Sequence, residues 1–221
     1  MTSAKTQMPP KWPFSPEDCE AMVAANIIAQ GEQADVLSGA RRFNVDEYMA
    51  IAEAGILRKE DRVELMDGEI IVMAPIGPPH EEGTDWLTLT LLPPLIGRAM
   101  VRVQGSMQLD DLSLPEPDVI VYRLRPRGSG RLTAAEVYFV IEVADSSLRY
   151  DSGPKLARYA EAGVPEVWIA NLRAQEVSVH ANPSGSGYTE VRVYRPGDSI
   201  TLSAFPDVSL AVADFMPPVS D

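Results

Sequence analysis

A single glutamate interrupts the most apolar segment of this chain. Residues Val137–Ala144 read VYFVIEVA, and every other side chain in the segment is apolar or aromatic. The β-branched and aromatic residues predict a strand that is buried on both faces of a sheet. An ionised carboxylate in such a strand is costly to desolvate unless it is paired or binds a metal ion. Glu142 is therefore a candidate for chemistry, and the alternative is a buried acid that an arginine neutralises.

A second carboxylate opens the preceding predicted strand. Asp118 begins the segment DVIVY, and residues 124–135, with one proline and two glycines, are typical of a loop. In an antiparallel pair, the start of the first strand faces the end of the second. Asp118 and Glu142 would then converge at one edge of the sheet, as a hard oxygen site suited to Mg²⁺ or Mn²⁺. A turn or capping role is the alternative for Asp118.

A lysine follows the two acids. Lys155 comes thirteen residues after Glu142, at the start of a helix expected over 154–162. A lysine near a metal ion can orient an attacking water or stabilise charge on phosphorus. Tyr159 lies one helical turn later on the same face, and Asp151 either reaches the same region or caps the helix. The alternative for Lys155 is an exposed lysine paired with an acid.

The other segments alternate between helix and strand signals. Helices are predicted from Ser15 to about residue 30, from Asn44 to Gly55, and from His80 to a kink or break at residues 93–94, where two prolines occur. Further strands are predicted at 62–66 and 69–73, joined by the turn Asp67-Gly68, and at 100–104, 107–109, 164–170, 176–180 and 188–194. Residues 1–15 are Pro-rich and expected to be disordered or loosely draped over the protein. This order predicts a mixed α/β domain.

Composition limits the setting of the protein. A chain of 221 residues, 45% of them hydrophobic, can bury one main core. Cys19 is the single cysteine, which excludes an intrachain disulfide and a cysteine zinc cluster. The first residues lack the apolar core of a signal peptide, and no apolar run is long enough to cross a bilayer. We therefore expect a cytoplasmic protein that does not act at a membrane.

The formal net charge of −13 opposes binding to nucleic acid. Such a molecule repels phosphate backbones unless basic patches or metal ions override the repulsion. The loop between the acid-bearing strands is a candidate patch near the cleft, with phosphate-contacting residues Arg123, Arg125, Arg127 and Arg131. The alternative is a solvated loop that balances nearby acids.

The ordered series of segments resembles the Uma-two family of putative restriction endonucleases, a branch of the PD-(D/E)XK nuclease superfamily. The matching segments are the helix from Asn44, RVELMDGE at 62–69, Pro79-His80, PDV at 117–119, IEVADSS at 141–147, Asp151, Lys155, Tyr159 and AGVPEVW at 162–168. Each short motif alone is uninformative, so the specificity lies in their order. Residues 43–221 would form the nuclease-like domain, and residues 1–42 an N-terminal extension, partly disordered and with one helix.

The resemblance implies a restriction-endonuclease-like core, in which helices flank a mixed central sheet with extra C-terminal strands. It implies that Asp118, Glu142 and the backbone carbonyl of Val143 bind the metal ion. The superfamily places its lysine two residues after the glutamate, where this chain has Ala144. Lys155 would therefore be the catalytic lysine and approach from the following helix.

Two further positions match the family. Glu64 is a candidate additional acid, although alternation along its strand favours a solvent-facing side chain. His80 is more simply explained as a residue at a helix start than as a ligand.

The resemblance implies a Mg²⁺- or Mn²⁺-dependent endonuclease that hydrolyses phosphodiester bonds in DNA. A homodimer is expected by symmetry for a chain that cuts both strands of a duplex. Two alternatives stay open because fold does not imply function. One is a non-catalytic scaffold for a basic protein partner, which the net charge favours. The other is a hydrolase of a small phosphorylated compound, which fits both the metal site and the acidity.

Overall fold

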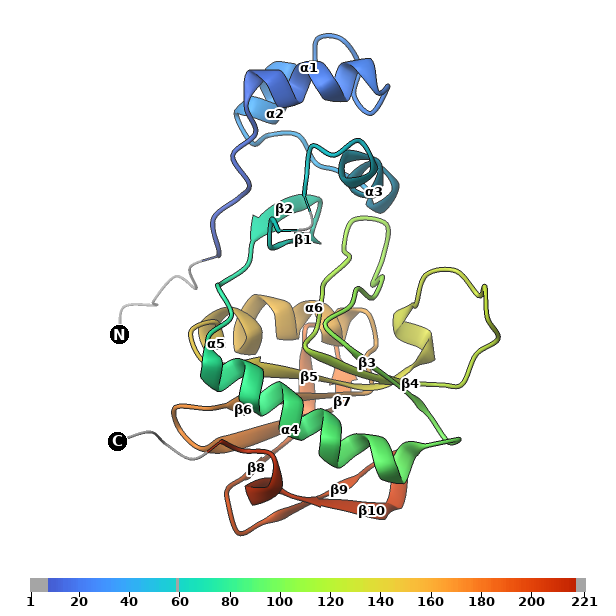
Figure 1. The fold of residues 1–221 in the computed structure, drawn as a ribbon, viewed down its shortest axis with the longest axis vertical. Coiled ribbons are helices and arrows are strands. Elements are labelled where there is room, and N and C mark those ends of the chain that lie inside the picture. The colour runs from blue at the N-terminus through green and yellow to red at the C-terminus, as the bar shows by residue number, and fades with distance from the viewer. Residues whose placement is uncertain (1–7, 59, 218–221) are drawn as a thin grey trace. The chain divides into compact units, whose positions relative to one another are not determined.

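The computed structural model describes residues 8–58 and 60–217, and it divides into two compact units. The first unit contains Ile76–Met107 and the described part of Glu116–Asp221. The second contains Pro9–Pro75 and Gln108–Pro115. The chain therefore builds the second unit from two separate segments (Figure 1).

The first unit is built on a mixed six-stranded sheet, as predicted. Its order is β3-β4-β5-β6-β7-β8. The β5–β6 pair is parallel, and the other four neighbouring pairs are antiparallel. The strands are β3 (Met100–Val103), β4 (Val119–Tyr122), β5 (Val137–Ala144), β6 (Glu166–Asn171), β7 (Glu176–Ser184) and β8 (Gly187–Tyr194).

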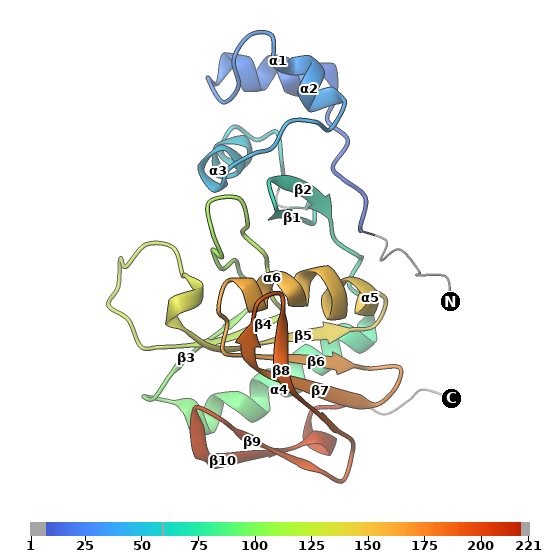
Figure 2. The ribbon, with the colours of Figure 1, turned by 180° about the vertical axis from the view of Figure 1, so that it is seen from behind.

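Helices cover both faces of this sheet (Figures 1 and 2). On one face, α4 (Pro78–Leu95) packs Leu87, Leu91 and Leu95 into a core with alternate residues of β4 and β5. On the other face lies a continuous helical segment, made of α5 (Leu148–Tyr150), a π-helical turn (Asp151–Lys155) and α6 (Leu156–Glu161). This covering explains why β5 is an almost entirely apolar strand.

Two of the predicted helices have different limits in the structure. The helix expected over 154–162 begins at Leu148, because the wider π-helical turn accommodates Pro154 within the segment. Lys155 therefore lies in the middle of this helical segment and not in its first turn. The prolines at 93–94 do not interrupt α4, which runs to Leu95. They lie in its last turn, so the two backbone N–H donors that they lack are missing only at the end of the helix.

The C-terminal region adds strands, as predicted. β7 and β8 form a hairpin that is longer than expected, since its strands include most of residues 182–187. A separate two-stranded sheet, β9 (Ser199–Leu202) and β10 (Phe205–Ala211), follows and was not predicted. Its apolar side chains join the core beneath α4. The strand expected at 107–109 is wrong, because the region has only isolated bridges.

The second unit contains three helices and a hairpin among its described residues. These are α1 (Pro16–Ala24), α2 (Gln33–Leu37), α3 (Val45–Glu53), β1 (Val63–Met66) and β2 (Glu69–Val72). Ser15 and Asn44 form the capping boxes of α1 and α3. The hairpin turn has positive φ at both Asp67 and Gly68, as its sequence predicts. The first helix ends earlier than expected, and α2 was not predicted.

The N-terminal region is part of this second unit. Lys11 pairs with Ile71, so residues 10–12 lie along β2, which corrects the expectation of disorder for these residues and leaves the alternative of a draped segment. Residues 1–7, included in that expectation, lie outside the described residues. One core joins Cys19 and Met22 with Phe43 and later residues, so the compact units are not divided at residue 42. The boundary at residue 42 marks the start of the family resemblance and stays a prediction. Within the described part of the chain, no helix is long and apolar enough to cross a membrane.

Candidate active site

Two buried carboxylates meet where β4 begins and β5 ends. Val119 pairs with Ile141 in an antiparallel register, and continuing this register by one residue sets Asp118 opposite Glu142. The predicted pairing of the two strands is thus confirmed. The backbone N–H of Val143 donates a 2.8 Å hydrogen bond to Oδ2 of Asp118. Because Asp118 is 8% exposed and Glu142 2% exposed, the site is largely shielded from bulk water.

Glu142 is held by two side chains from the helix on its own face of the sheet. Nζ of Lys155 lies 3.1 Å from Oε1 of Glu142. The hydroxyl of Tyr159 donates a 2.6 Å hydrogen bond to the same oxygen. The helical spacing of Lys155 and Tyr159 therefore brings both to Glu142, as predicted. Lys155 is 2% exposed, so its alternative as an exposed lysine is wrong, and a lysine rather than an arginine neutralises Glu142.

The π-helical turn positions two charged residues in the interior. Asp151 and Lys155 are the first and last residues of this turn, and both are buried. Nζ of Lys155 also lies 6.0 Å from the ring centroid of Tyr150, on the ring face. Single π-helical turns occur often at functional sites, because the extra residue redirects side chains. Asp151 is therefore part of the charged surroundings of Glu142 rather than a cap at a helix start.

The pKa of Glu142 is raised well above its ordinary value. Burial is the largest cause, because it disfavours the ionised form. The negative charges of Asp151 and Asp118 raise this pKa further, whereas Lys155 and the Tyr159 hydrogen bond lower it in part. Three carboxyl groups therefore surround Lys155, and a cation bound here would favour the ionised form of Glu142 over its protonated form.

His80 reaches the site from the first turn of α4. Its Nε2 atom lies 3.0 Å from Oδ1 of Asp118. Its Nδ1 atom is buried and has no hydrogen-bond partner among the described residues. A Cβ added at Gly83 would lie 3.4 Å from Cγ1 of Val143, an ordinary contact distance, so α4 packs directly against β5 here. His80 does lie at a helix start, as expected, but it also contacts the first acid of the site.

Comparison with known proteins shows the family and the fold of this chain. The model of the Uma2 family, described as putative restriction endonucleases, matches residues 45–213. This chain belongs to the Uma2 family. It is also similar to the crystal structure of a putative nuclease belonging to DUF820 from Anabaena variabilis ATCC 29413, with a TM-score of 0.60. That match covers 79% of this chain and 97% of the other at 17% identity, so it shows the fold alone. Among curated proteins, none matches the chain.

The donor chemistry of this Uma2 site fits a divalent metal ion. The described residues contain no group of three His, Cys, Asp or Glu side chains already arranged around a metal position. Mg²⁺ does not require such a cage, since it is bound by one or two carboxylates together with water and substrate phosphates. Asp118 and Glu142 are the predicted source of those carboxylates, and the Val143 carbonyl is a predicted further ligand.

The arginine loop lies away from the acids. It joins the end of β4 to the start of β5, so it lies at the opposite end of the strand pair from Asp118 and Glu142 (Figure 1). Arg125 donates a 2.6 Å hydrogen bond to the carbonyl of Ser129 and lies 3.5 Å from Glu136, which holds the loop together. Arg123 stacks on the ring of Tyr138 at 5.0 Å. The expected position near the cleft is wrong, whereas the exposed Arg127 and Arg131 remain predicted phosphate contacts.

Glu64 belongs to the second unit and is fully buried within β1. The expectation of a solvent-facing side chain is therefore wrong. All four residues of β1 are buried, so both faces of this strand are covered and alternation does not bring Glu64 to water. Its role as an additional acid of the site stays a prediction.

Proposed function

We propose that this protein is a Mg²⁺- or Mn²⁺-dependent endonuclease that hydrolyses phosphodiester bonds in DNA. The strongest support is the group formed by Asp118, Glu142 and Lys155 where β4 begins and β5 ends. In this group Nζ of Lys155 lies 3.1 Å from Oε1 of Glu142. Two carboxylates can hold the metal ion that assists phosphodiester hydrolysis, and a lysine can stabilise the charge that develops on phosphorus. Membership in a family of putative restriction endonucleases supports the same reaction class. A cytoplasmic location is part of the proposal.

Asp118 and Glu142 would hold the metal ion, which supplies a Lewis acid that lowers the pKa of a bound water and stabilises charge on phosphorus. The Val143 N–H fixes Oδ2 of Asp118 and His80 fixes Oδ1, so this carboxylate has a defined orientation before any ligand binds. The hydroxyl of Tyr159 orients Oε1 of Glu142 in the same way, by donating a hydrogen bond to it. Such outer contacts orient ligating side chains and tune their affinity for metal.

Lys155 would act on the substrate side of the reaction. Its ammonium group is buried and fixed beside Glu142, so it needs little reorganisation to meet a developing negative charge. In that position it can orient the attacking water by hydrogen bonding and neutralise charge on the phosphoryl oxygens. Lys155 comes from the helical segment and not from β5, so it approaches the site from a different element than in the superfamily pattern. Its positive charge would still stabilise the negative charge on the phosphoryl group.

The experiment that tests this proposal is a cleavage assay on supercoiled and linear DNA with Mg²⁺, Mn²⁺ or EDTA. Wild type should nick or cut DNA in a metal-dependent way, and Asp118→Ala and Glu142→Ala should not. Glu190→Gln is the matched control, because Glu190 is an acid of the same unit that lies on β8 outside the site. Metal-dependent cleavage retained by Asp118→Ala would overturn the assignment.

A small phosphorylated compound is the second candidate substrate. The net charge of −13 favours it, because a small ligand needs no extended basic surface. A panel of nucleotides, sugar phosphates and aryl phosphodiesters, assayed with the same variants, separates this candidate from a DNA substrate. The non-catalytic scaffold is a third candidate, and it is favoured if wild type neither binds metal nor cleaves any of these substrates.

A further inference from the structure

The last strand of the six-stranded sheet has a partner strand on one side only. β8 pairs with β7 along the hairpin, and within the described part of the chain no strand pairs with its other side. Its central residues are open to solvent, since Val191 is 54% exposed and Val193 46% exposed. An edge strand presents backbone N–H and C=O groups that can pair with a further strand. The outer side of β8 is therefore a candidate docking surface.

β8 lacks most of the features that keep edge strands from pairing. Residues 187–194 contain no proline and no lysine. The register of β8 with β7 is constant along the hairpin, so no bulge turns the strand away. Its two charged side chains, Glu190 and Arg192, have opposite signs. Such charges oppose a further strand only where that strand sets like charges opposite them.

The side chains of β8 are arranged symmetrically about Val191. In both directions from this residue, the strand has a charged residue, then a β-branched residue and then a tyrosine. The residues at equal distances are Glu190 and Arg192, Thr189 and Val193, and Tyr188 and Tyr194. In an antiparallel pairing of two copies about a two-fold axis at Val191, each residue lies opposite the other member of its pair. The strand is thus complementary to a second copy of itself.

We propose that β8 pairs with β8 of a second copy of this chain, so that two six-stranded sheets form one continuous sheet in a homodimer. Seven aligned residues on each strand would form about six to eight backbone hydrogen bonds, because alternate pairs in an antiparallel ladder exchange two bonds each. The two-fold axis is perpendicular to the sheet, so each face continues from one copy into the next. Thr189, Val191 and Val193 of both copies would then adjoin on one face and cover apolar surface that is exposed in the single chain.

The charges of the two strands match without loss of the ion pair that each strand already has. Arg192 pairs with Glu190 on the same side of β8 within one chain. Across the axis, Glu190 would lie opposite Arg192 of the second copy. Each of the four charges would then have an opposite charge beside it along its own strand and another across the axis, and only diagonal neighbours would be alike. Opposite charges directly across antiparallel strands stabilise the pairing, whereas like charges destabilise it.

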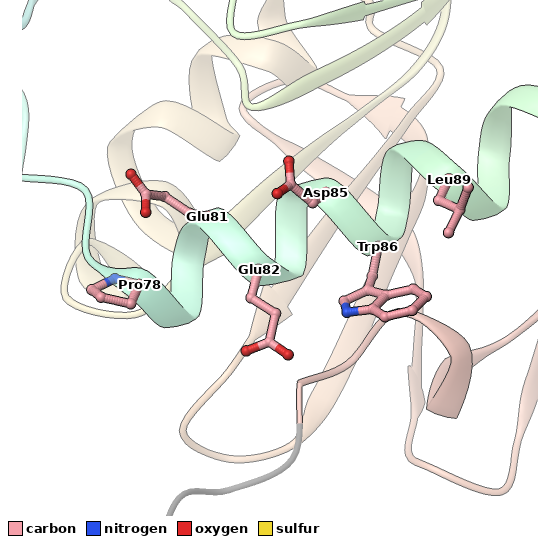
Figure 3. Close-up of a pocket in the computed structure, with 6 residues that line it drawn as sticks. All are labelled: Pro78, Glu81, Glu82, Asp85, Trp86 and Leu89. Atoms are coloured by element: carbon pink, nitrogen blue, oxygen red, sulfur yellow. The ribbon is translucent and has the colours of Figure 1, made fainter.

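The outer side of α4 offers a second copy no such match. Its exposed Trp86 borders a shallow depression that Glu81, Glu82 and Asp85 also line (Figure 3). These three side chains carry the same sign of charge, so two copies that met here would bring like charges together. Self-complementarity therefore favours β8 as the interface between copies.

This inference is independent of the proposed function, because it involves none of the residues assigned to metal binding or hydrolysis. Glu190→Gln retains the backbone of β8 and sets no like charges directly opposite one another. It therefore remains suitable as a control for cleavage and metal binding, whereas charge reversal is needed to test the interface.

Sedimentation velocity of the full-length chain over a range of concentrations tests the interface. Wild type should form a dimer. Glu190→Arg and Arg192→Glu should each raise the dimer dissociation constant at least about tenfold, because each change brings four like charges together. Glu20→Arg, the same change on an exposed residue of α1, should leave the dimer intact.

Two combinations of these changes test the register. The double variant Glu190→Arg/Arg192→Glu exchanges the two charges and should dimerise like wild type, because opposite charges again face each other. An equimolar mixture of the two single variants should form a heterodimer, since one strand then carries two positive charges and the other two negative charges. Recovery in both cases is expected from antiparallel pairing of β8 with itself and not from an interface elsewhere.

Three results would overturn the proposal. These are a wild type that is monomeric at every concentration, a dimer that neither single variant weakens, and single variants that weaken the dimer but form no heterodimer when mixed. Circular dichroism checks that each variant is folded. Should the charge reversals disturb the hairpin, Val191→Lys decides the question, because it sets two positive charges together at the axis and should dissociate the dimer. Leu124→Lys is its matched control, since Leu124 is also 54% exposed.

Discussion

Lys155 and Glu142 form an ion pair in the interior of the protein, with 3.1 Å between Nζ and Oε1 and with both side chains almost fully buried. Taking two charges out of water is costly, and an apolar pair of similar volume is often at least as stable. A contribution to folding is therefore a poor explanation for this pair. A site that handles charged phosphate groups needs such charges in place, which agrees with the proposed reaction.

Removing the lysine alone should strongly destabilise the protein. Lys155→Met leaves Glu142 buried without its cation, and breaking a buried pair in this way costs about 3 kcal/mol or more. Urea unfolding without metal, at a pH above the folded pKa of Glu142 so that this carboxyl is ionised, measures the loss. The double variant Lys155→Met/Glu142→Gln should recover much of it, because no charge is then left unpaired. Arg158→Met, on the same helix, should have a much smaller effect; an equal loss in both single variants would contradict this account.

Metal binding should depend on both acids. Titration calorimetry with Mn²⁺ should show binding to wild type and none to the Asp118→Asn/Glu142→Gln variant, because two carboxylates become neutral amides of the same size. Glu190→Gln should bind metal like wild type. Heat released equally by the double variant and wild type would show that the ion binds elsewhere.

Loss of the Tyr159 hydroxyl should weaken the site without abolishing it. Tyr159→Phe removes the donor of the 2.6 Å hydrogen bond to Glu142 and leaves Lys155 in place. A hydrogen bond to a charged group contributes about 1.5–3 kcal/mol, so the free energy of unfolding should fall by roughly that amount. Tyr188→Phe, which loses a hydrogen bond to the Val164 carbonyl instead, is a control for metal affinity. Unchanged metal affinity in Tyr159→Phe would indicate that the hydroxyl serves only the fold.

The core of the site could be predicted from the sequence because local rules determine it. Antiparallel pairing across a loop brings Asp118 to Glu142, and helical spacing puts Tyr159 beside Lys155. The burial of Lys155 could not be predicted in this way, because it depends on a π-helical turn. Pro154 lies inside this turn, whereas a proline in a sequence usually indicates the start of a helix. Sequence patterns for single elements do not encode such a turn.

Long-range packing explains what was missed. His80 meets Asp118 only because α4 docks on the sheet, which patterns within single elements do not predict. The prediction for Glu64 was wrong because alternation along a strand assumes that one face of the strand contacts solvent, whereas both faces of β1 are buried. The prediction that the arginine loop lies near the acids was wrong. The loop follows the end of β4, whereas Asp118 precedes the start of β4, so the two lie at opposite ends of the strand.

His80 should affect metal affinity through Asp118. His80→Ala removes the nitrogen that lies 3.0 Å from Oδ1 of Asp118, and loss of such an outer contact typically lowers metal affinity about 10–100-fold. His80→Gln retains a donor nitrogen at a similar reach and should restore part of the affinity. Thr84→Ala, one turn later on α4, is the control for changes in the helix. Equal affinities of His80→Ala and wild type would leave His80 with a role in packing only.

The raised pKa of Glu142 should make stability and metal binding depend on pH in opposite directions. In the unfolded chain this carboxyl ionises near its ordinary pKa of 4.5, whereas in the folded protein it holds its proton to higher pH. Its contribution to stability is therefore fully present below the ordinary pKa and is lost as the pH rises through the raised folded pKa. Without metal, the free energy of unfolding of wild type should fall relative to Glu142→Gln over this window.

Metal affinity should rise over the same window, because the ion competes with the proton for the carboxylate. Calorimetry in buffers of different ionisation enthalpy, between about pH 5 and about pH 8, measures the protons released on binding. Proton release should be largest below the folded pKa of Glu142 and should vanish above it. Metal binding without proton release throughout this range would mean that Glu142 is already ionised in the metal-free protein, and that Lys155 and Tyr159 offset its burial completely.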